Sequence, residues 1–291
     1  MTVDPRAELS EFLRSRRARL SPDDVGLPHY GRARRVPGLR REELAQLAGV
    51  SVAYYTRLEQ GNGRNVSDEV LDSISNALRL NDTERTYLRN LAVCPHTTKK
   101  KKTATTRVRP ALRNLLDYVG VPAYIGGRRS DVLAWNPMAA ALFGDWAEVP
   151  PPERNWARFI FLQPSYQQLF VNWESKAADV VGFLRMDAGC YPNDPELAAL
   201  IGELSVKSEL FRQLWARHDV KEKSFGTKVL RHPLVGEMTL SYETLKIPSE
   251  PDLFFTTYHA EPASPSAEAL RLLASWGKDA TQVGISAGTQ S

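Results

Sequence analysis

The sequence has 291 residues, of which 42% are hydrophobic, and this length is enough for two domains with separate cores. Residues 1–102 carry 19 Lys and Arg against 13 Asp and Glu, whereas the rest is slightly acidic, so a polyanionic partner is expected for the N-terminal part alone. No apolar run is long enough to span a membrane, no signal segment opens the chain, and Cys94 and Cys190 lack metal-binding spacing. These features argue against membrane insertion, a disulfide framework and a zinc site, and they predict a cytoplasmic protein.

The first predicted helix spans residues 8–20 and opens an all-α domain predicted over residues 6–94. Its apolar side chains recur at helical spacing and face inward, whereas four arginines face outward: Arg14, Arg16, Arg17 and Arg19. A loop rich in Pro and Gly follows over residues 21–38, and its arginines are either phosphate contacts or solvated side chains. After a central pair of helices, two more complete the domain, one capped by Ser67 and the last starting near Asp82.

Residues 41–48 and 52–60 predict the central pair, two short helices joined by a tight turn at Gly49. Ser51 is positioned to cap the second of these helices, and Gly61 follows its end. Two helices joined in this way form a helix-turn-helix, in which the second helix enters the major groove of DNA.

The outward face of that second helix carries side chains suited to reading bases, because Tyr55 and Leu58 take the side that faces the core. Small residues at its start allow close approach to base edges, and Arg57 can pair with both acceptors of a guanine. Arg41 begins the preceding helix, where the helix dipole favours a phosphate, and Arg64 follows in the next turn. The alternative is an ordinary helical hairpin with a solvated basic face. The predicted DNA-contacting residues are Arg40, Arg41, Ser51, Val52, Ala53, Tyr54, Thr56, Arg57 and Arg64.

Residues 95–109 are predicted to form a basic linker. Four consecutive lysines, residues 99–102, are flanked by threonines, and the segment has almost nothing to bury. We expect it to add at most non-specific contact with phosphates.

The second domain, predicted over residues 110–278, contains all six tryptophans and has mixed secondary structure. Two strands, an inserted helical block and three further strands make an α+β plan that resembles a PAS-like sensor fold. Residues 279–291 are expected to be a disordered tail. The expected helices span residues 112–119, 138–143, 164–186, 195–218 and 265–276, and the expected strands span residues 122–127, 130–136, 223–231, 237–243 and 253–259.

Two sets of motifs resemble a known family of regulators. The central helix pair resembles the phage-repressor or Xre-type helix-turn-helix, and motifs of the second domain resemble the MmyB-like ligand-binding domain. The resemblance covers residues 6–276 and implies a bacterial transcriptional regulator whose sensor domain holds a fatty-acid-like ligand. Residues 170–173 depart from the family pattern, because they are less polar than expected. The motifs are Leu44-Ala-Gln-Leu-Ala-Gly-Val-Ser51, Tyr55-Thr-Arg-Leu-Glu-Gln-Gly61, Val132-Leu-Ala-Trp-Asn-Pro137, Asn155-Trp-Ala-Arg-Phe159, Phe211-Arg-Gln-Leu-Trp-Ala216 and His232-Pro-Leu-Val-Gly236.

A sheet backed by tryptophan-rich helices can enclose an apolar cavity in which a few polar groups hold a head group. A packed core without a cavity is the alternative, with Arg158 in a salt bridge and His232 capping a turn. The candidate ligand-binding residues are four wall residues, Trp135, Trp173, Phe211 and Trp215, and two partners for a carboxylate, Arg158 and His232.

The sequence indicates a regulator and not an enzyme. It contains no G-x-S-x-G, H-E-x-x-H or Walker motif, and its five histidines lack metal-ligand spacing. We therefore expect no catalytic residues, no metal and no cofactor apart from a fatty-acid-like ligand. The expected partner is a double-stranded, near-palindromic DNA operator, bound at the nucleoid by a homodimer. A fragment of residues 1–95 is expected to fold and to bind DNA, but more weakly than the full chain. The alternatives for the second domain are a dimerisation or protein-interaction module without a ligand, and a cryptic acyl-processing enzyme.

Overall fold

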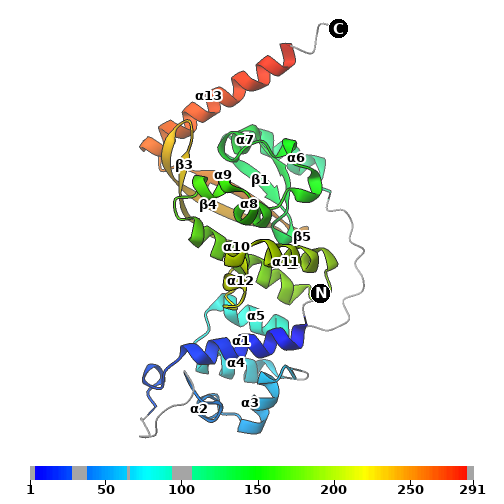
Figure 1. The fold of residues 1–291 in the computed structure, drawn as a ribbon, viewed down its shortest axis with the longest axis vertical. Coiled ribbons are helices and arrows are strands. Elements are labelled where there is room, and N and C mark those ends of the chain that lie inside the picture. Colours follow the sequence, from blue (N-terminus) through cyan, green and yellow to red (C-terminus); the bar gives the residue numbers. More distant parts are fainter. Residues whose placement is uncertain (1–3, 28–37, 64–65, 94–106, 287–291) are drawn as a thin grey trace. The chain divides into compact units, whose positions relative to one another are not determined.

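The computed structural model describes residues 4–27, 38–63, 66–93 and 107–286, and its chain divides into two compact units (Figure 1). The first unit contains residues 1–99 and 181–222, and the second contains residues 100–180 and 223–291. The sequence predicted a single boundary, in a linker over residues 95–109, most of which lies outside the described residues. By its contacts, segment 181–222 belongs to the first unit, whereas the sequence placed it in the second domain, residues 110–278.

The N-terminal part of the first unit contains the predicted helices. Asp4, Ser51 and Ser67 cap three of them, each with a side-chain oxygen that accepts a backbone N–H of the first turn. The helices are α1 (Pro5–Arg19), α2 (Arg41–Leu47), α3 (Val52–Glu59), α4 (Asp68–Ala77) and α5 (Asp82–Val93), with a short 3₁₀ helix η1 (Asp23–Val25) after α1. Their buried side chains form one core cluster.

Two arginines of α1 were predicted to face solvent and do not. Arg16 is only 3% exposed, with its Nε 2.7 Å from Oε1 of Glu84, while Arg17 is half-buried against Glu59. The prediction failed because a charge pattern alone does not reveal carboxylates elsewhere in the chain that pair with these cations.

The first unit also contains a later stretch of helices. It includes the second half of α10 (Trp173–Cys190), together with α11 (Pro195–Lys207) and α12 (Glu209–Trp215). Met186 and Val220 pack against the core cluster of α1 to α5. At Gly189 a Cβ atom would collide with the ring of Tyr87, so glycine permits this close approach of α10 to α5.

The second unit contains an antiparallel sheet. Its order among the described residues is β2-β1-β5-β4-β3. The strands are β1 (Ala123–Gly126), β2 (Val132–Trp135), β3 (Phe225–His232), β4 (Gly236–Ile247) and β5 (Glu250–His259). The helices are α6 (Pro110–Tyr118), α7 (Pro137–Phe143), α8 (Trp156–Leu162), α9 (Pro164–Leu169), the first half of α10 and α13 (Pro265–Ser286), with 3₁₀ helices η2 (Arg128–Ser130), η3 (Trp146–Glu148) and η4 (Pro151–Glu153). An all-α region followed by an α+β unit confirms the predicted fold class.

Successive residues of β1 pack against different layers, because side chains alternate across a strand. Ile125 joins Leu112 and Leu116 of α6 in one cluster. Tyr124 instead contacts the rings of Trp146 and Trp156. The sheet is thus covered by α6 on one face and by an aromatic layer on the other.

The long helices predicted in the middle of the chain are broken. The pattern over residues 164–186 is split after α9, and the pattern over 195–218 is split at Ser208, whose Oγ caps α12. At the C-terminus α13 continues to Ser286 because no proline interrupts it, so helix occupies the start of the predicted tail. In the part of the chain described here, no helix has both the length and the apolar character needed to cross a bilayer.

Candidate nucleic-acid interface and candidate ligand groove

Helix α3 exposes the face that the sequence predicted for DNA. Ser51 Oγ accepts the N–H of Tyr54 at 3.1 Å, which starts the helix, and Tyr55 and Leu58 are buried on its inner side. Val52 is 41% exposed, so its methyl groups are available for contact with a base. Ala53 and Arg57 are also exposed, whereas Tyr54 and Thr56 are half-buried.

Arg57 is the long cation on this face. Its guanidinium makes no hydrogen bond or ion pair with the other residues that the structure describes. A planar group that is free in this way can pair with a guanine without first breaking an internal contact. Arg64 and the arginines of residues 28–37 lie outside the described residues.

The buried carboxylate of Glu59, at the end of α3, connects three helices. Its Oε1 accepts Nε and Nη2 of Arg17 at 2.8 and 2.7 Å, and its Oε2 accepts Nε of Arg41. Arg17 Nη1 also donates to the Leu39 carbonyl at 2.6 Å. Since Arg17 lies on α1 and Arg41 on α2, these bonds fix α3 against both helices. The sequence analysis missed this role of Glu59, because helical spacing within α3 does not indicate contacts with residues of other helices.

Arg40 and Arg41 begin α2 as predicted. The Arg40 N–H donates to Oε2 of Glu43 at 2.7 Å, and its side chain is exposed. Arg41 already has a partner, because its guanidinium is hydrogen-bonded to Glu59. This bond and the charge of Glu59 raise the pKa of Arg41. Arg40 is therefore the freer candidate for a phosphate contact, and Arg41 has a structural part as well.

The aromatic layer of the second unit is centred on Trp146 and Trp156. Trp146 stacks on Phe143 with ring centroids 5.7 Å apart, and its Nε1 donates to the Tyr166 hydroxyl at 2.7 Å. Burial raises the pKa of Tyr166 to about 12, so this phenol stays neutral. Trp156 meets Phe143 edge to face at 5.1 Å. These rings are packed core residues.

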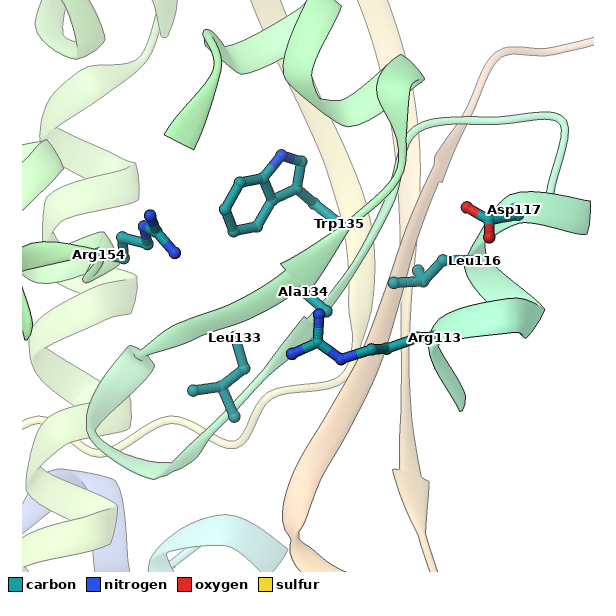
Figure 2. Close-up of a pocket in the computed structure, with 7 residues that line it drawn as sticks. All are labelled: Arg113, Leu116, Asp117, Leu133, Ala134, Trp135 and Arg154. Carbon is teal, nitrogen blue, oxygen red and sulfur yellow. The ribbon is translucent and has the colours of Figure 1, made fainter. Parts of the chain in front are cut away.

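A groove opens instead between α6 and β2, with a volume of about 330 Å³ (Figure 2). Its walls come from Leu116 and Leu133 and from the half-buried Trp135. The guanidinium of Arg154 lies 5.2 Å from the centroid of the Trp135 ring and donates to the Val149 carbonyl at 2.7 Å. The lining residues are Arg113, Leu116, Asp117, Leu133, Ala134, Trp135 and Arg154.

Arg113 is the arginine of this groove with the fewest contacts to other residues. Figure 2 shows its side chain extending from α6 toward β2. It is exposed and forms no hydrogen bond or ion pair with the rest of the described chain. The sequence pointed to Trp135 here and missed Arg113 and Arg154. The amphipathic pattern of residues 110–118, with Arg113 beside its apolar stripe, is the signal that was available.

Two family models match this chain. The model described as MmyB-like transcription regulator ligand binding domain matches residues 108–273, and the model described as Helix-turn-helix domain matches residues 8–88. The chain belongs to the MmyB-like family of transcription regulators. It is a DNA-binding regulator with a ligand-binding domain, as the resemblance implied. No curated protein matches it.

The predicted ligand-binding residues of this regulator are dispersed over both units. Phe211 and Trp215 lie in the first unit, where their rings stack at 5.7 Å. In the second unit, Trp173 donates from Nε1 to the Ile160 carbonyl at 2.9 Å, and Arg158 donates to the Pro152 carbonyl at 2.7 Å. Trp135 alone among the six predicted residues lines the groove.

His232, the other predicted partner of a carboxylate, is buried and internally bonded. Its Nε2 lies 3.1 Å from the Ala141 carbonyl, and its Nδ1 accepts the N–H of Leu234 at 3.3 Å. These two bonds correspond to the neutral Nε2–H tautomer. Burial also lowers its pKa, despite the hydrogen bond to Ala141 that acts in the opposite direction. The geometry matches the alternative in which His232 supports a turn.

No group of three or more His, Cys, Asp or Glu side chains in the described ranges is arranged to hold a metal ion.

Proposed function

We propose that this regulator reads a specific DNA operator with the outward face of α3, and that a small amphipathic carboxylate bound in the second unit changes its affinity for that operator. The observation that carries the DNA part is the orientation of α3. Its core side is buried, its cap is satisfied, and its exposed side presents Val52, Ala53 and Arg57, which has no ion pair among the described residues. This is the arrangement in which a recognition helix enters the major groove.

The test of base reading is Arg57→Ala. A duplex selected by the parent protein from a random library serves as the specific site, and a scrambled duplex as the reference. Losing a bidentate contact should weaken binding to the selected duplex by about 1–3 kcal/mol and leave the scrambled duplex nearly unchanged. Fluorescence anisotropy at fixed salt measures both, because phosphate contacts depend strongly on salt.

Arg40→Ala is the matched control for phosphate contact. It should weaken binding to the two duplexes by similar factors, because a phosphate carries no base identity. Arg41→Ala is less suitable, since it also removes a partner of the buried Glu59. Unchanged discrimination in Arg57→Ala would mean that another face of the domain reads the bases.

The ligand part of the proposal rests on the chemistry of the groove between α6 and β2. Leu116, Leu133 and Trp135 supply apolar surface, while Arg113 supplies a cation that is not paired within the described part of the chain. That combination suits an acyl chain with a carboxylate head group, and a volume of about 330 Å³ is at the small end for ligand sites. Arg154, held over Trp135, is a second positive group for the same anion.

Arg113→Gln tests this site, with myristate and myristyl alcohol as probes. In the parent protein, myristate should raise the melting temperature more than the alcohol does, because only the acid can pair with Arg113. The variant should lose that difference. Arg231→Gln, at an exposed arginine of β3 that pairs with Glu237, is the matched control and should behave as the parent does. Equal stabilisation of parent and Arg113→Gln by myristate would place the ligand elsewhere.

We further propose that the regulator binds DNA as a homodimer, located with its operator at the nucleoid. A two-fold protein matches a near-palindromic site, and the ligand acts by favouring one arrangement of the dimer. Native mass spectrometry tests both statements, because it reports the oligomeric state and any co-purified acyl molecule together. A dimer with no ligand under any condition would favour a dimerisation module, and conversion of the acyl probe would indicate an enzyme.

A further inference from the structure

The segment of residues 181–222 lies within the matched ligand-binding family region, yet it is part of the first unit together with the DNA-reading helix. Its residues pack directly against the helices of that unit. Met186 and Val220 pack on the core of α1 to α5, and Gly189 permits contact between α10 and the ring of Tyr87. A family region assigned to ligand binding therefore supplies part of the structure that supports DNA recognition.

Arg185 is the centre of these contacts and is fully buried. Its Nη1 donates to both carboxylate oxygens of Glu8, at 2.6 Å for Oε2, and lies 2.9 Å from Nδ1 of His218. Its Nη2 donates to the Trp215 carbonyl, and the guanidinium lies 4.0 Å from the centroid of the Trp215 ring. Both Nη atoms of Arg185 thus have partners, whereas its buried Nε has no hydrogen-bond partner in the described part of the chain. Pairing a buried cation with a carboxylate in this way restricts the geometry of both groups.

Helix α1 connects the Glu8–Arg185 pair with α3, the proposed DNA-reading helix. Glu8 and Arg17 are nine residues apart on α1, and at 3.6 residues per turn that spacing puts them on opposite sides of the helix. Glu8 pairs with Arg185 of α10, while Arg17 pairs with Glu59 at the end of α3. The helix is thus held on one side by the ligand-binding family region and itself holds α3 on the other.

We propose that Arg185 is a positioning residue for DNA recognition, which sets the orientation of α3 through Glu8, α1 and the Arg17–Glu59 pair. The proposal rests on the assignment of α3 as the DNA-reading helix. Helix α10 also contributes residues 173–180 to the second unit. Arg185 then contributes to DNA recognition and not only to the stability of the fold.

The test compares Glu8→Gln, Arg185→Gln and the double variant in the full-length protein. Each is measured for melting temperature and for discrimination between the selected and the scrambled duplex. Each single variant leaves one buried charge or polar group without its partner, so its melting temperature should fall. The double variant has no unpaired charge and should regain most of that melting temperature. Its discrimination should nevertheless stay at least about fivefold below that of the parent, the lower end of typical couplings between sites.

A merely structural role makes the opposite prediction, since discrimination would then recover with the melting temperature. A double variant with parental discrimination overturns the proposal. Should the double variant fail to fold, Arg185→Lys decides. It keeps the charge but not the fork of donors, and normal discrimination in the folded Lys variant overturns the proposal equally. Arg212→Gln, at an exposed arginine of the same segment, is the control and should match the parent. The Arg57→Ala measurement tests the role of α3 separately, so failure there is distinguishable.

Discussion

The interiors of the two units differ in their main contacts, although the second unit also contains an ion pair, between the buried Asp179 and Lys228. In the first unit several buried side chains are ionised and pair between helices distant in sequence: Glu8 with Arg185, Arg16 with the half-buried Glu84, and Glu59 with Arg17 and Arg41. In the second unit the layer on one face of the sheet is aromatic, with Phe143, Trp146, Trp156, Phe159 and Tyr166 in mutual contact.

The difference concerns how strictly each interior fixes geometry. Forked hydrogen bonds between charges have few satisfactory arrangements, and losing one partner leaves a costly unpaired charge. Aromatic pairs prefer stacked or edge-to-face arrangements, and both occur in this layer. We infer that the ion pairs of the first unit hold α3 in a defined orientation.

The largest effect is expected for Arg185→Met. The variant leaves the Glu8 carboxylate buried without its main partner, and breaking a buried pair in this way typically costs about 3–5 kcal/mol. Urea unfolding followed by circular dichroism measures the loss. Arg212→Met removes an exposed arginine from the neighbouring helix and should change the unfolding free energy little. Equal effects of the two substitutions would contradict the idea of a charged interior.

A smaller effect is expected for Trp146→Phe in the aromatic layer. The phenyl ring retains most of the packing but no longer donates to the Tyr166 hydroxyl, and a buried polar group without its partner costs about 1–3 kcal/mol. Discrimination between DNA duplexes should stay at the parental level, because this layer belongs to the second unit. Tyr118→Phe, at an exposed tyrosine of α6, is the control for unfolding.

Ser67→Ala should cost about 1 kcal/mol, since its hydroxyl accepts the N–H of Val70 at the start of α4. This local effect lies in the first unit but outside its network of buried ion pairs. Thermal unfolding should therefore shift slightly while discrimination between duplexes remains parental. A loss of discrimination would show that any weakening of the first unit disturbs α3.

The smallest effect at ordinary pH is expected from titration of Glu8. Burial alone would raise its pKa, but the hydrogen bond with His218 and the charge of Arg185 together hold the pKa below the ordinary 4.5. A lowered folded-state pKa means that ionised Glu8 contributes its full stabilisation above pH 4.5 and loses it as the pH falls through the folded value. Glu8→Gln should lack this component of acid unfolding. Identical acid profiles for parent and variant would assign it to other carboxylates.

The helix-turn-helix could be predicted from the sequence because its signals are local. Ser51 and Ser67 cap helices as expected, and Tyr55 and Leu58 are buried on the predicted side of α3. The strands of the second unit and its α+β plan followed from similar short-range patterns. Such features depend on residues within a few positions of one another.

The ion pairs and the division of the chain into units could not be predicted in the same way. Arg16 was assigned to solvent, and Glu8 and Arg185 are 177 positions apart, so no spacing indicated their contact. Segment 181–222 was placed in the predicted second domain, where Phe211-Arg-Gln-Leu-Trp-Ala216 resembles a motif of the MmyB-like ligand-binding domain, and the family match over residues 108–273 includes it. The sequence analysis missed part of the groove, because Arg113 lies near Trp135 only in the fold, where α6 and β2 are adjacent.

Hydrogen–deuterium exchange of the intact protein tests most directly whether segment 181–222 belongs to the DNA-reading unit. Arg185→Gln should reduce amide protection in α1, in α5 and over residues 181–215 together, because they form one cooperative region. Strands β1, β4 and β5 should keep the protection that they have in the parent. Loss of protection over residues 181–215 with α1 unchanged would contradict the account. It would show that this segment does not unfold together with the helix-turn-helix.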